Sequence, residues 1–423
     1  MRLLGQDGSK SILIAGGVIQ WIGASPERPP DPPVATTLDG HGATALPGLI
    51  DSHVHFDALA AAKDRQSALD VRTEIFPITM RQTLASGVTT ARVHLAALDD
   101  LELMKALAAD DCFPAPRMAL AGPGLLGGAP EVDARLMRGV AGPDDAKDKV
   151  ATLAQLGAEW VALHGIARFA DAELDAIVAA AADAGVQLMA DTDGLDDLEV
   201  ALRWPVSSGE YLNRSQTPRY PESLMAAITA RDGPFFVVPP VGYYRRSHLY
   251  ARGGEAAIDP AVLAFVDEEL AGQMRAGFAD EFERDPYVAG ALESYPTHRD
   301  KFHQLRTAGA RLVIGSDSGS LGQFHYDAVW QEMAAWHVYG VAPDEVVAAA
   351  TTRPAGLLRR SDVGVIAAGA RGDVVLYDGD IAAGSFERAH VRAVVKGGVV
   401  FVAESQWVGP DRAQMLAMMG AHE

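Results

Sequence analysis

Short apolar runs alternate with Ala-rich amphipathic stretches through the middle of the chain. Eight runs have the length and composition of strands: 48–56, 87–95, 115–122, 158–165, 186–194, 206–212, 233–241 and 310–319. Most are separated by helix-like stretches such as 171–185, DAELDAIVAAAADAG. Eight strand–helix repeats predict an α/β fold built on a (β/α)8 TIM-type barrel. An open doubly wound sheet is the alternative, but no glycine-rich phosphate-binding fingerprint follows the first strand.

Both ends of the chain have a different, β-rich pattern. Residues 11–23 read as two short strands around Gly16 and Gly17, which is a hairpin signal. Residues 369–380 and 391–405 are again short apolar runs separated by glycine turns. The sequence therefore predicts a small β-sandwich-like domain formed by both chain ends. The predicted boundaries are 1–47 and 361–423 for the small domain and 48–360 for the barrel.

Composition and charge narrow the class of partner. The formal net charge of −20 argues against nucleic acid or an anionic membrane surface as the main partner, and favours a small-molecule substrate. The single cysteine, Cys112, excludes an intrachain disulfide framework and fits a reducing compartment. The N-terminal stretch lacks the apolar core of a signal peptide, so we expect a cytoplasmic protein. The oligomeric state is left open, a homo-oligomer included.

The segment PGLIDSHVHF, residues 47–56, places two histidines near the end of the first predicted barrel strand. His53 and His55 are two apart, so their side chains share one face of a strand. The eighth strand, LVIGSDSG, carries Asp317, and a buried carboxylate there needs a cation or hydrogen bonds. First and last strands are neighbours in a closed barrel. These three residues therefore predict a site for Zn²⁺ or a similar divalent ion, with a coordination position open for water.

These motifs resemble the amidohydrolase superfamily, and most of the chain follows its imidazolonepropionase/prolidase-like branch. PGLIDSHVHF looks like the first-strand signature and AGARLVIGSDSG like that of the eighth strand. SGVTTARVHL, GAEWVALHG, AGVQLMADTDG and ALRWPVSSGEYL are similar to strands two, four, five and six, in that order. The resemblance implies a metal-dependent barrel hydrolase in which Asp317 carries a proton.

The sequence departs from that branch at three ligand positions. Ala162 stands where the branch has a bridging carbamylated lysine, and Asp191 and Tyr211 stand where it has histidines. We therefore expect the binuclear centre of the family to be absent. A single divalent ion, Zn²⁺ for preference, would be held by His53, His55, Asp317 and Asp191.

Other titratable residues near the strand ends have two readings each. Asp191 is a ligand or an acid/base group, or else only hydrogen-bonds a loop. His164 ligates the ion, or orients a ligand by a hydrogen bond. Tyr211 donates to a substrate oxyanion, or fills the space of the missing imidazole. His94 ends the second strand and is expected to line the pocket.

Two longer insertions, 213–232 and 242–300, follow strands six and seven. Residues 242–254, GYYRRSHLYARGG, are read as a loop that either closes on an anionic or aromatic substrate group or is simply a solvated loop with an aromatic anchor. Tyr243 and Arg245 are its expected substrate contacts. After strand eight, His325 and Glu332 resemble a family pair beside the pocket mouth, and His325 is expected to bind substrate.

Three functions fit these residues. The first is a mononuclear metal hydrolase of an amide or cyclic C–N bond, in which water attacks a carbonyl. The second is a non-hydrolytic lyase, isomerase or cyclase that uses Asp191, Tyr211 and His164 as acid/base groups, with or without a metal. The third, a catalytically inactive binding barrel, is disfavoured because His53, His55 and Asp317 occur together.

Overall fold

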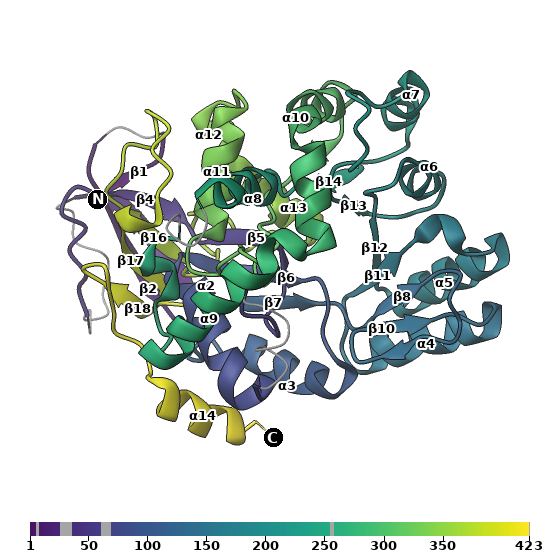
Figure 1. Cartoon of the computed structure of the whole chain (residues 1–423). Helices are drawn as coiled ribbons and strands as arrows, with labels where there is room; N and C mark the ends of the chain where they lie inside the picture. The colour runs from purple at the N-terminus through teal and green to yellow at the C-terminus, as the bar shows by residue number, and fades with distance from the viewer. Residues whose placement is uncertain (6–7, 26–35, 61–68, 254–257, 423) are drawn as a thin grey trace.

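A computed structural model describes residues 1–5, 8–25, 36–60, 69–253 and 258–422. The proline-rich stretch 26–33 lies outside the described residues. The described chain is a mixed α/β structure in which parallel strands alternate with helices (Figure 1). No helix in this part of the chain is long and apolar enough to span a bilayer.

Eight parallel strands follow one another around a ring. Each of the eight predicted strand segments contains one of them. In ring order they are β5 (Leu49–Val54), β6 (Val88–Val93), β7 (Arg117–Leu120), β11 (Trp160–His164), β12 (Gln187–Asp191), β13 (Ser208–Glu210), β14 (Phe236–Val238) and β15 (Arg311–Leu312). One parallel bridge joins Ala121, which follows β7, to Trp160 of β11. Another joins Val54 of β5 to Ser318, which lies in the segment after β15. These two bridges connect the three-stranded group β5–β6–β7 to the remaining strands on both sides, as in a TIM-type barrel.

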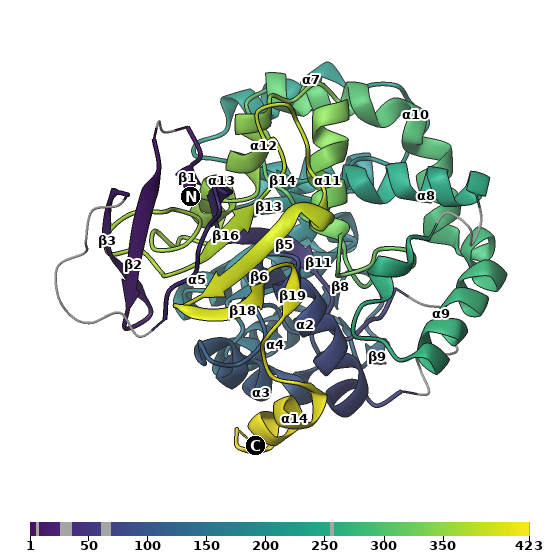
Figure 2. The same ribbon diagram turned by 90° about the vertical axis from the view of Figure 1, so that its left-hand side faces the viewer.

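Helices surround the ring of strands. Figure 1 shows α4, α5, α6 and α7 along its right-hand side, and Figure 2 shows α8, α9 and α10 along its right-hand side. The bounds are α2 Phe76–Ala85, α3 Leu98–Ala109, α4 Pro143–Gln155, α5 Asp171–Ala184, α6 Leu195–Arg203, α7 Glu222–Ala230, α8 Val241–Gly253, α9 Glu268–Glu281, α10 Pro286–Thr307, α11 Ala328–Val338, α12 Pro343–Ala349 and α13 Thr352–Leu357. A last helix, α14 (Arg412–Gly420), follows the C-terminal strands.

The interior of the ring is filled by apolar side chains beneath the strand ends. Ala119, Ala162, Met189, Val238 and Val313 belong to one buried cluster there. Ala162 is paired in register with Met189 on the neighbouring strand. This packed layer closes the barrel from below, so polar residues that follow it along the strands face a cavity at the carboxyl ends.

Strands from both chain ends form one six-stranded sheet, which Figure 2 shows crossing the side of the molecule that carries the N-terminus. Its order is β1 (Arg2–Leu3), β4 (Thr44–Pro47), β16 (Val374–Tyr377), β17 (Val391–Lys396), β18 (Val399–Ala403) and β19 (Gln406–Trp407). The hairpin expected at 11–23 is present as β2 (Lys10–Ala15) and β3 (Val18–Ala24). Its turn residues Gly16 and Gly17 have φ values of 61° and 78°, which glycine adopts without a Cβ clash. The exact domain boundaries stay a prediction.

The segment expected to be a loop at 242–254 forms a helix instead over its described residues, because α8 runs through Val241–Gly253. The Glu332 carboxylate accepts hydrogen bonds from the backbone N–H of Val241, at 2.8 Å, and of Gly242. The first N–H groups of a helix have no partner within the helix, so these two hydrogen bonds stabilise the N-terminus of α8. The aromatic residues Tyr243, Tyr244 and Tyr250, which suggested an anchor, are the buried face of this helix.

Candidate metal and substrate site

A cavity of about 330 Å³ lies at the carboxyl ends of the barrel strands. Its lining includes six of the residues predicted from the strand ends: His55, His94, His164, Asp191, Tyr211 and Asp317. The remaining lining residues are Asp57, Ala58, Leu95, Leu136, Met137, Arg214, Tyr243, Tyr244, Asp285, Gly319, Ser320 and Leu321. This is the face on which barrel enzymes place their active sites.

The predicted metal triad is assembled in the structure. Nε2 of His53 lies 3.3 Å from Nε2 of His55, and Oδ1 of Asp317 lies 3.5 Å and 3.2 Å from these two nitrogens. Ligands at 2.0–2.2 Å from a tetrahedral Zn²⁺ are separated from each other by about 3.3–3.6 Å. The three donor atoms therefore already have the mutual spacing that a tetrahedral divalent ion requires.

A buried ion pair fixes the orientation of His53. Nδ1 of His53 donates to Oε2 of Glu210 at 2.9 Å. This leaves the lone pair on Nε2, which faces the other two residues of the triad. The other carboxylate oxygen, Oε1, accepts from Arg92 at 2.7 Å and from Ser208 at 2.7 Å. The side chains of Glu210, Arg92 and Ser208 are completely buried. Burial would raise the pKa of Glu210, but Arg92 and His53 outweigh it and hold that pKa at about 2.

Asp317 occupies a strained backbone position at the end of the eighth strand. Its φ is +55°, a left-handed conformation that costs a non-glycine residue about 1–3 kcal/mol. Oδ1 also accepts a hydrogen bond from Ser320 Oγ at 2.9 Å. Burial would raise the pKa of Asp317, but the hydrogen bond from His55 and the charges of His53 and His55 keep it below its usual value. The Asp317 carboxylate is therefore ionised, and it faces the two histidines of the triad.

Asp191 belongs to a second cluster rather than to the triad. Its Oδ2 lies 2.7 Å from Nδ1 of His164, and its Oδ1 lies 3.4 Å from Nε2 of His94. These three residues form their own group of potential ligand atoms, all within 4.8 Å of one another. The expectation that Asp191 joins His53, His55 and Asp317 is thus replaced by a His94–Asp191–His164 cluster on strands two, five and four.

The two clusters are in contact through stacked imidazoles. The rings of His53 and His94 are 4.0 Å apart between centroids, with planes inclined by 19°. Burial and the charge of His53 lower the pKa of His94 to about 3, against the opposing effect of Asp191, so its ring is neutral at ordinary pH. Burial would raise the pKa of Asp191, but the charge and hydrogen bond of His164 hold it well below its usual value.

Tyr211 points its hydroxyl at the triad. The hydroxyl oxygen lies 3.3 Å from Nε2 of His53. Strand alternation gives the inward position to Glu210 of β13, and Tyr211 reaches the cavity because its φ of +71° turns the chain at the strand end. Burial, with the charges of Asp317 and Asp191, raises the pKa of Tyr211 well above its usual value. Its hydroxyl therefore keeps its proton and can donate a hydrogen bond, and a contact with a substrate oxyanion stays a prediction.

Part of the cavity wall is aromatic, and an arginine lies beside it. Tyr243 and Tyr244 come from the first turn of α8, so Tyr243 lines the cavity as expected. Arg245 is half-buried and is not among the described residues of the lining. The arginine that does line it is Arg214, whose guanidinium lies 2.8 Å from Asp193 and 5.4 Å from the centre of the Tyr211 ring.

His325 and Glu332 support the site from behind. Nε2 of His325 donates to the backbone carbonyl of His55 at 3.0 Å, and its ring stacks on Phe56. Glu332 binds the first N–H groups of α8 and Nε1 of Trp336. Neither lines the cavity. The expected substrate contact of His325 is therefore a positioning contact to the chain segment that carries His55.

Three residues of the site did not stand out in the sequence. Arg92 and Glu210 are charges inside apolar strand segments, and each needed a buried partner to be stable there, which was a usable signal. Arg214 follows β13 in an insertion and has no such signal. Its position depends on how that insertion folds back over the strand ends.

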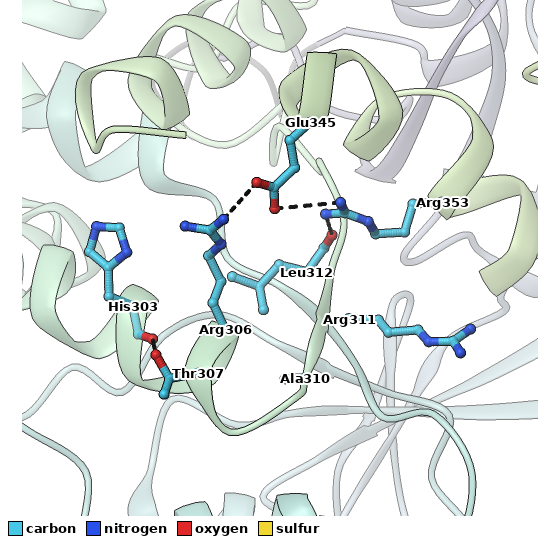
Figure 3. A pocket seen from close by; sticks show the side chains of 8 residues that line it. All are labelled: His303, Arg306, Thr307, Ala310, Arg311, Leu312, Glu345 and Arg353. Atoms are coloured by element: carbon cyan, nitrogen blue, oxygen red, sulfur yellow. Dashed lines mark hydrogen bonds and ion pairs between the residues drawn. The ribbon is translucent and has the colours of Figure 1, made fainter. Parts of the chain in front are cut away.

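A second cavity of about 500 Å³ lies away from these residues, near the start of β15 (Figure 3). Arg306 and Arg353 both reach the Glu345 carboxylate, at 2.6 Å and 3.6 Å, while Arg311 points away from it (Figure 3). Arg353 also donates to the carbonyl of Leu312 at 2.8 Å. Because these charges satisfy one another at the amino end of a strand, we do not assign the reaction to this cavity.

Comparison with known proteins agrees with this geometry. Residues 44–213 and 266–401 match the model of the amidohydrolase family. An imidazolonepropionase from Salinispora arenicola (strain CNS-205) is 26% identical over 379 residues, which cover 89% of this chain and 87% of that protein.

Solved structures show the same fold. A crystal structure of an amidohydrolase has a TM-score of 0.72 and 22% identity, covering 94% of this chain and 95% of its own. A Xaa-Pro dipeptidase with methionine bound in its active site has a TM-score of 0.71 and 20% identity, covering 93% and 95%. The predicted branch is confirmed, and a hydrolase is favoured over the lyase, isomerase or cyclase alternative. The chain belongs to the amidohydrolase family and is a hydrolase of C–N bonds.

Proposed function

We propose that this protein is a metal-dependent hydrolase that cleaves an amide or cyclic C–N bond of a small molecule. The observation that carries the proposal is the convergence of His53 Nε2, His55 Nε2 and Asp317 Oδ1 at 3.2–3.5 Å from one another. A divalent ion held there, Zn²⁺ for preference, would polarise the substrate carbonyl and lower the pKa of a water molecule.

The residues of the chain have distinct parts in this reaction. Asp317 accepts the proton of the attacking water and delivers it to the leaving nitrogen. Tyr211 donates its hydroxyl hydrogen to the oxyanion that forms on the carbonyl carbon, where a single such donor is worth about 2.7–4 kcal/mol in well-studied hydrolases. Glu210 and Arg92 hold the His53 ring in one tautomer.

The size of the cavity supports a small-molecule substrate. Its volume of about 330 Å³ is at the low end for drug-sized ligands. Tyr243 and Tyr244 offer apolar surface, and Arg214 offers a positive charge to a carboxylate. Since one structural relative is a Xaa-Pro dipeptidase, dipeptides are the first class to test. We further propose that the protein acts in the cytoplasm, without nucleic acid or membrane partners.

Hydrolysis in ¹⁸O-labelled water tests this proposal. The protein is incubated with a panel of dipeptides, N-acyl amino acids and cyclic amides, before and after chelation and after Zn²⁺ is restored. We expect one ¹⁸O atom in the new carboxylate, loss of turnover on chelation, and recovery with the ion. His55→Ala should remain inactive, whereas His303→Gln, which changes a histidine outside the cavity, should behave as wild type. Turnover that survives complete chelation would contradict the metal dependence.

A further inference from the structure

A buried histidine beside the triad has no hydrogen-bonding partner among the described residues. His94 is 2% exposed, and neither of its ring nitrogens makes a hydrogen bond within the part of the chain that the structure describes. Oδ1 of Asp191 is likewise buried without one. A buried polar atom left without a partner costs about 1–3 kcal/mol, so three such atoms in one place indicate that something binds there.

The unpartnered atoms face each other. Nε2 of His94 and Oδ1 of Asp191 are 3.4 Å apart, the same spacing as in the His53–His55–Asp317 triad. A neutral imidazole nitrogen and a carboxylate oxygen at this distance both present lone pairs to the space between them when the proton is on Nδ1. A cation in that space would satisfy both.

His164 supplies the third donor. Its Nδ1 lies 2.7 Å from Oδ2 of Asp191, which is a hydrogen-bond distance, so this nitrogen binds a cation once it has lost the proton that it shares with Asp191. The three residues come from strands two, four and five of the barrel and face the same cavity as the triad. Their ligand atoms lie within 4.8 Å of one another.

We propose that His94, Asp191 and His164 bind a second divalent cation beside the first. Two imidazole nitrogens and one carboxylate suit Zn²⁺ or another borderline first-row ion, with water completing the coordination. This site uses strands two, four and five of this chain. It uses neither Ala162, which stands at the position of the family's bridging lysine, nor Tyr211, which stands at the position of the family's strand-six histidine. The expectation of one ion per chain rested on those two substitutions and did not consider His94.

The inference goes beyond the proposed function, which needs only the ion at His53, His55 and Asp317. It also gives His164 and Asp191 one shared role in place of two separate readings. The stacking of His53 on His94, at 4.0 Å, places the two ligand sets side by side.

The inference is tested by measuring how many ions the metal-free wild-type protein and four variants bind. The purified full chain is stripped with a chelator, confirmed to be folded by circular dichroism and its melting temperature, and titrated with Co²⁺ alone, which has a visible absorption spectrum when bound. We expect two equivalents in the wild type, and one equivalent in His94→Ala and in Asp191→Ala. His53→Ala should also retain one, at the second cluster, and the matched control His303→Gln should bind two.

Each other result has a defined meaning. One ion in the wild type that is lost in His53→Ala and kept in His94→Ala overturns the inference and leaves the proposed function intact. One ion that is lost in both variants also overturns it, because the two clusters would then share a single ion. No bound ion in the wild type overturns both the inference and the proposed function.

Discussion

Glu210 and His53 form a buried pair in which Oε2 of the glutamate accepts the Nδ1 proton of the histidine at 2.9 Å. This contact decides which nitrogen of His53 faces the metal triad. Carboxylates that orient metal-binding histidines in this way raise ligand basicity and fix the ring. Arg92, at 2.7 Å from the other oxygen, keeps the glutamate ionised.

Glu210→Gln should therefore weaken metal binding at the triad. The amide can place its NH₂ group toward His53, which favours the wrong tautomer, and we expect the dissociation constant to rise about 10- to 100-fold. Competition with a coloured chelator measures it. Glu199→Gln, an exposed change on α6, is the control. Unchanged affinity in Glu210→Gln would show that the triad does not depend on this contact.

Asp317→Asn should separate metal binding from catalysis. The amide keeps an oxygen toward the ion but cannot accept the proton of water, so we expect kcat to fall by about 10²- to 10⁴-fold. Metal content should fall much less. Steady-state kinetics together with elemental analysis checks both. If Asp317→Asn keeps the wild-type kcat, another group carries the proton.

Arg214 rather than Arg245 should recognise an anionic substrate group. Arg214→Gln removes a partly buried guanidinium from the cavity wall, and we expect KM to rise about 10- to 100-fold, equivalent to a charge-assisted contact of about 1.5–3 kcal/mol. Arg245→Gln is the matched control and should leave KM unchanged. Equal KM values for both variants on every anionic substrate would remove Arg214 from recognition.

His298 should make the protein sensitive to acid. It is fully buried in α10 against Tyr244, and burial, with the charges of Lys301 and Arg214, lowers its pKa from 6.5 to about 3 despite the backbone of Asn213. At pH values between these two pKa values, His298 binds a proton in the unfolded chain but not in the folded chain. The free energy of unfolding therefore decreases as the pH falls from about 6.5 toward 3, by about 3 kcal/mol at pH 4.5.

Urea titrations at pH 7 and pH 4.5 measure this effect. The loss of stability between the two pH values should be smaller in His298→Leu than in the wild type, whatever the variant does at neutral pH. His303→Leu, on the same helix, is the control. An equal pH dependence in His298→Leu and the wild type would show that His298 titrates normally in the folded protein.

The sequence by itself determined the barrel and the triad His53, His55 and Asp317. Eight short apolar runs separated by helical stretches predicted eight strands, and each lies within its predicted range. His53, His55 and Asp317 could be found because strand alternation and the closure of a barrel are local and topological rules. They require no knowledge of side-chain packing.

The tertiary structure decided which residues meet across strands. Asp191 was placed with the triad from the sequence, but the register of β11 and β12 brings it to His164, and β6 brings His94 to the same point. Glu210 acts on His53 from a strand 157 residues away. Such contacts depend on register and rotamers, which no local pattern encodes.

In the insertion after β14, too, contacts with distant residues decided a structure that the local pattern did not predict. The stretch GYYRRSHLYARGG has no strong helical periodicity, so its mixed aromatic and basic residues suggested a loop. Glu332, ninety residues further along the chain, holds the N-terminus of α8, and burial of Tyr243 and Tyr244 fixes its face. A local sequence determines a helix only when its own side chains provide the stabilising contacts, and here distant residues provide them.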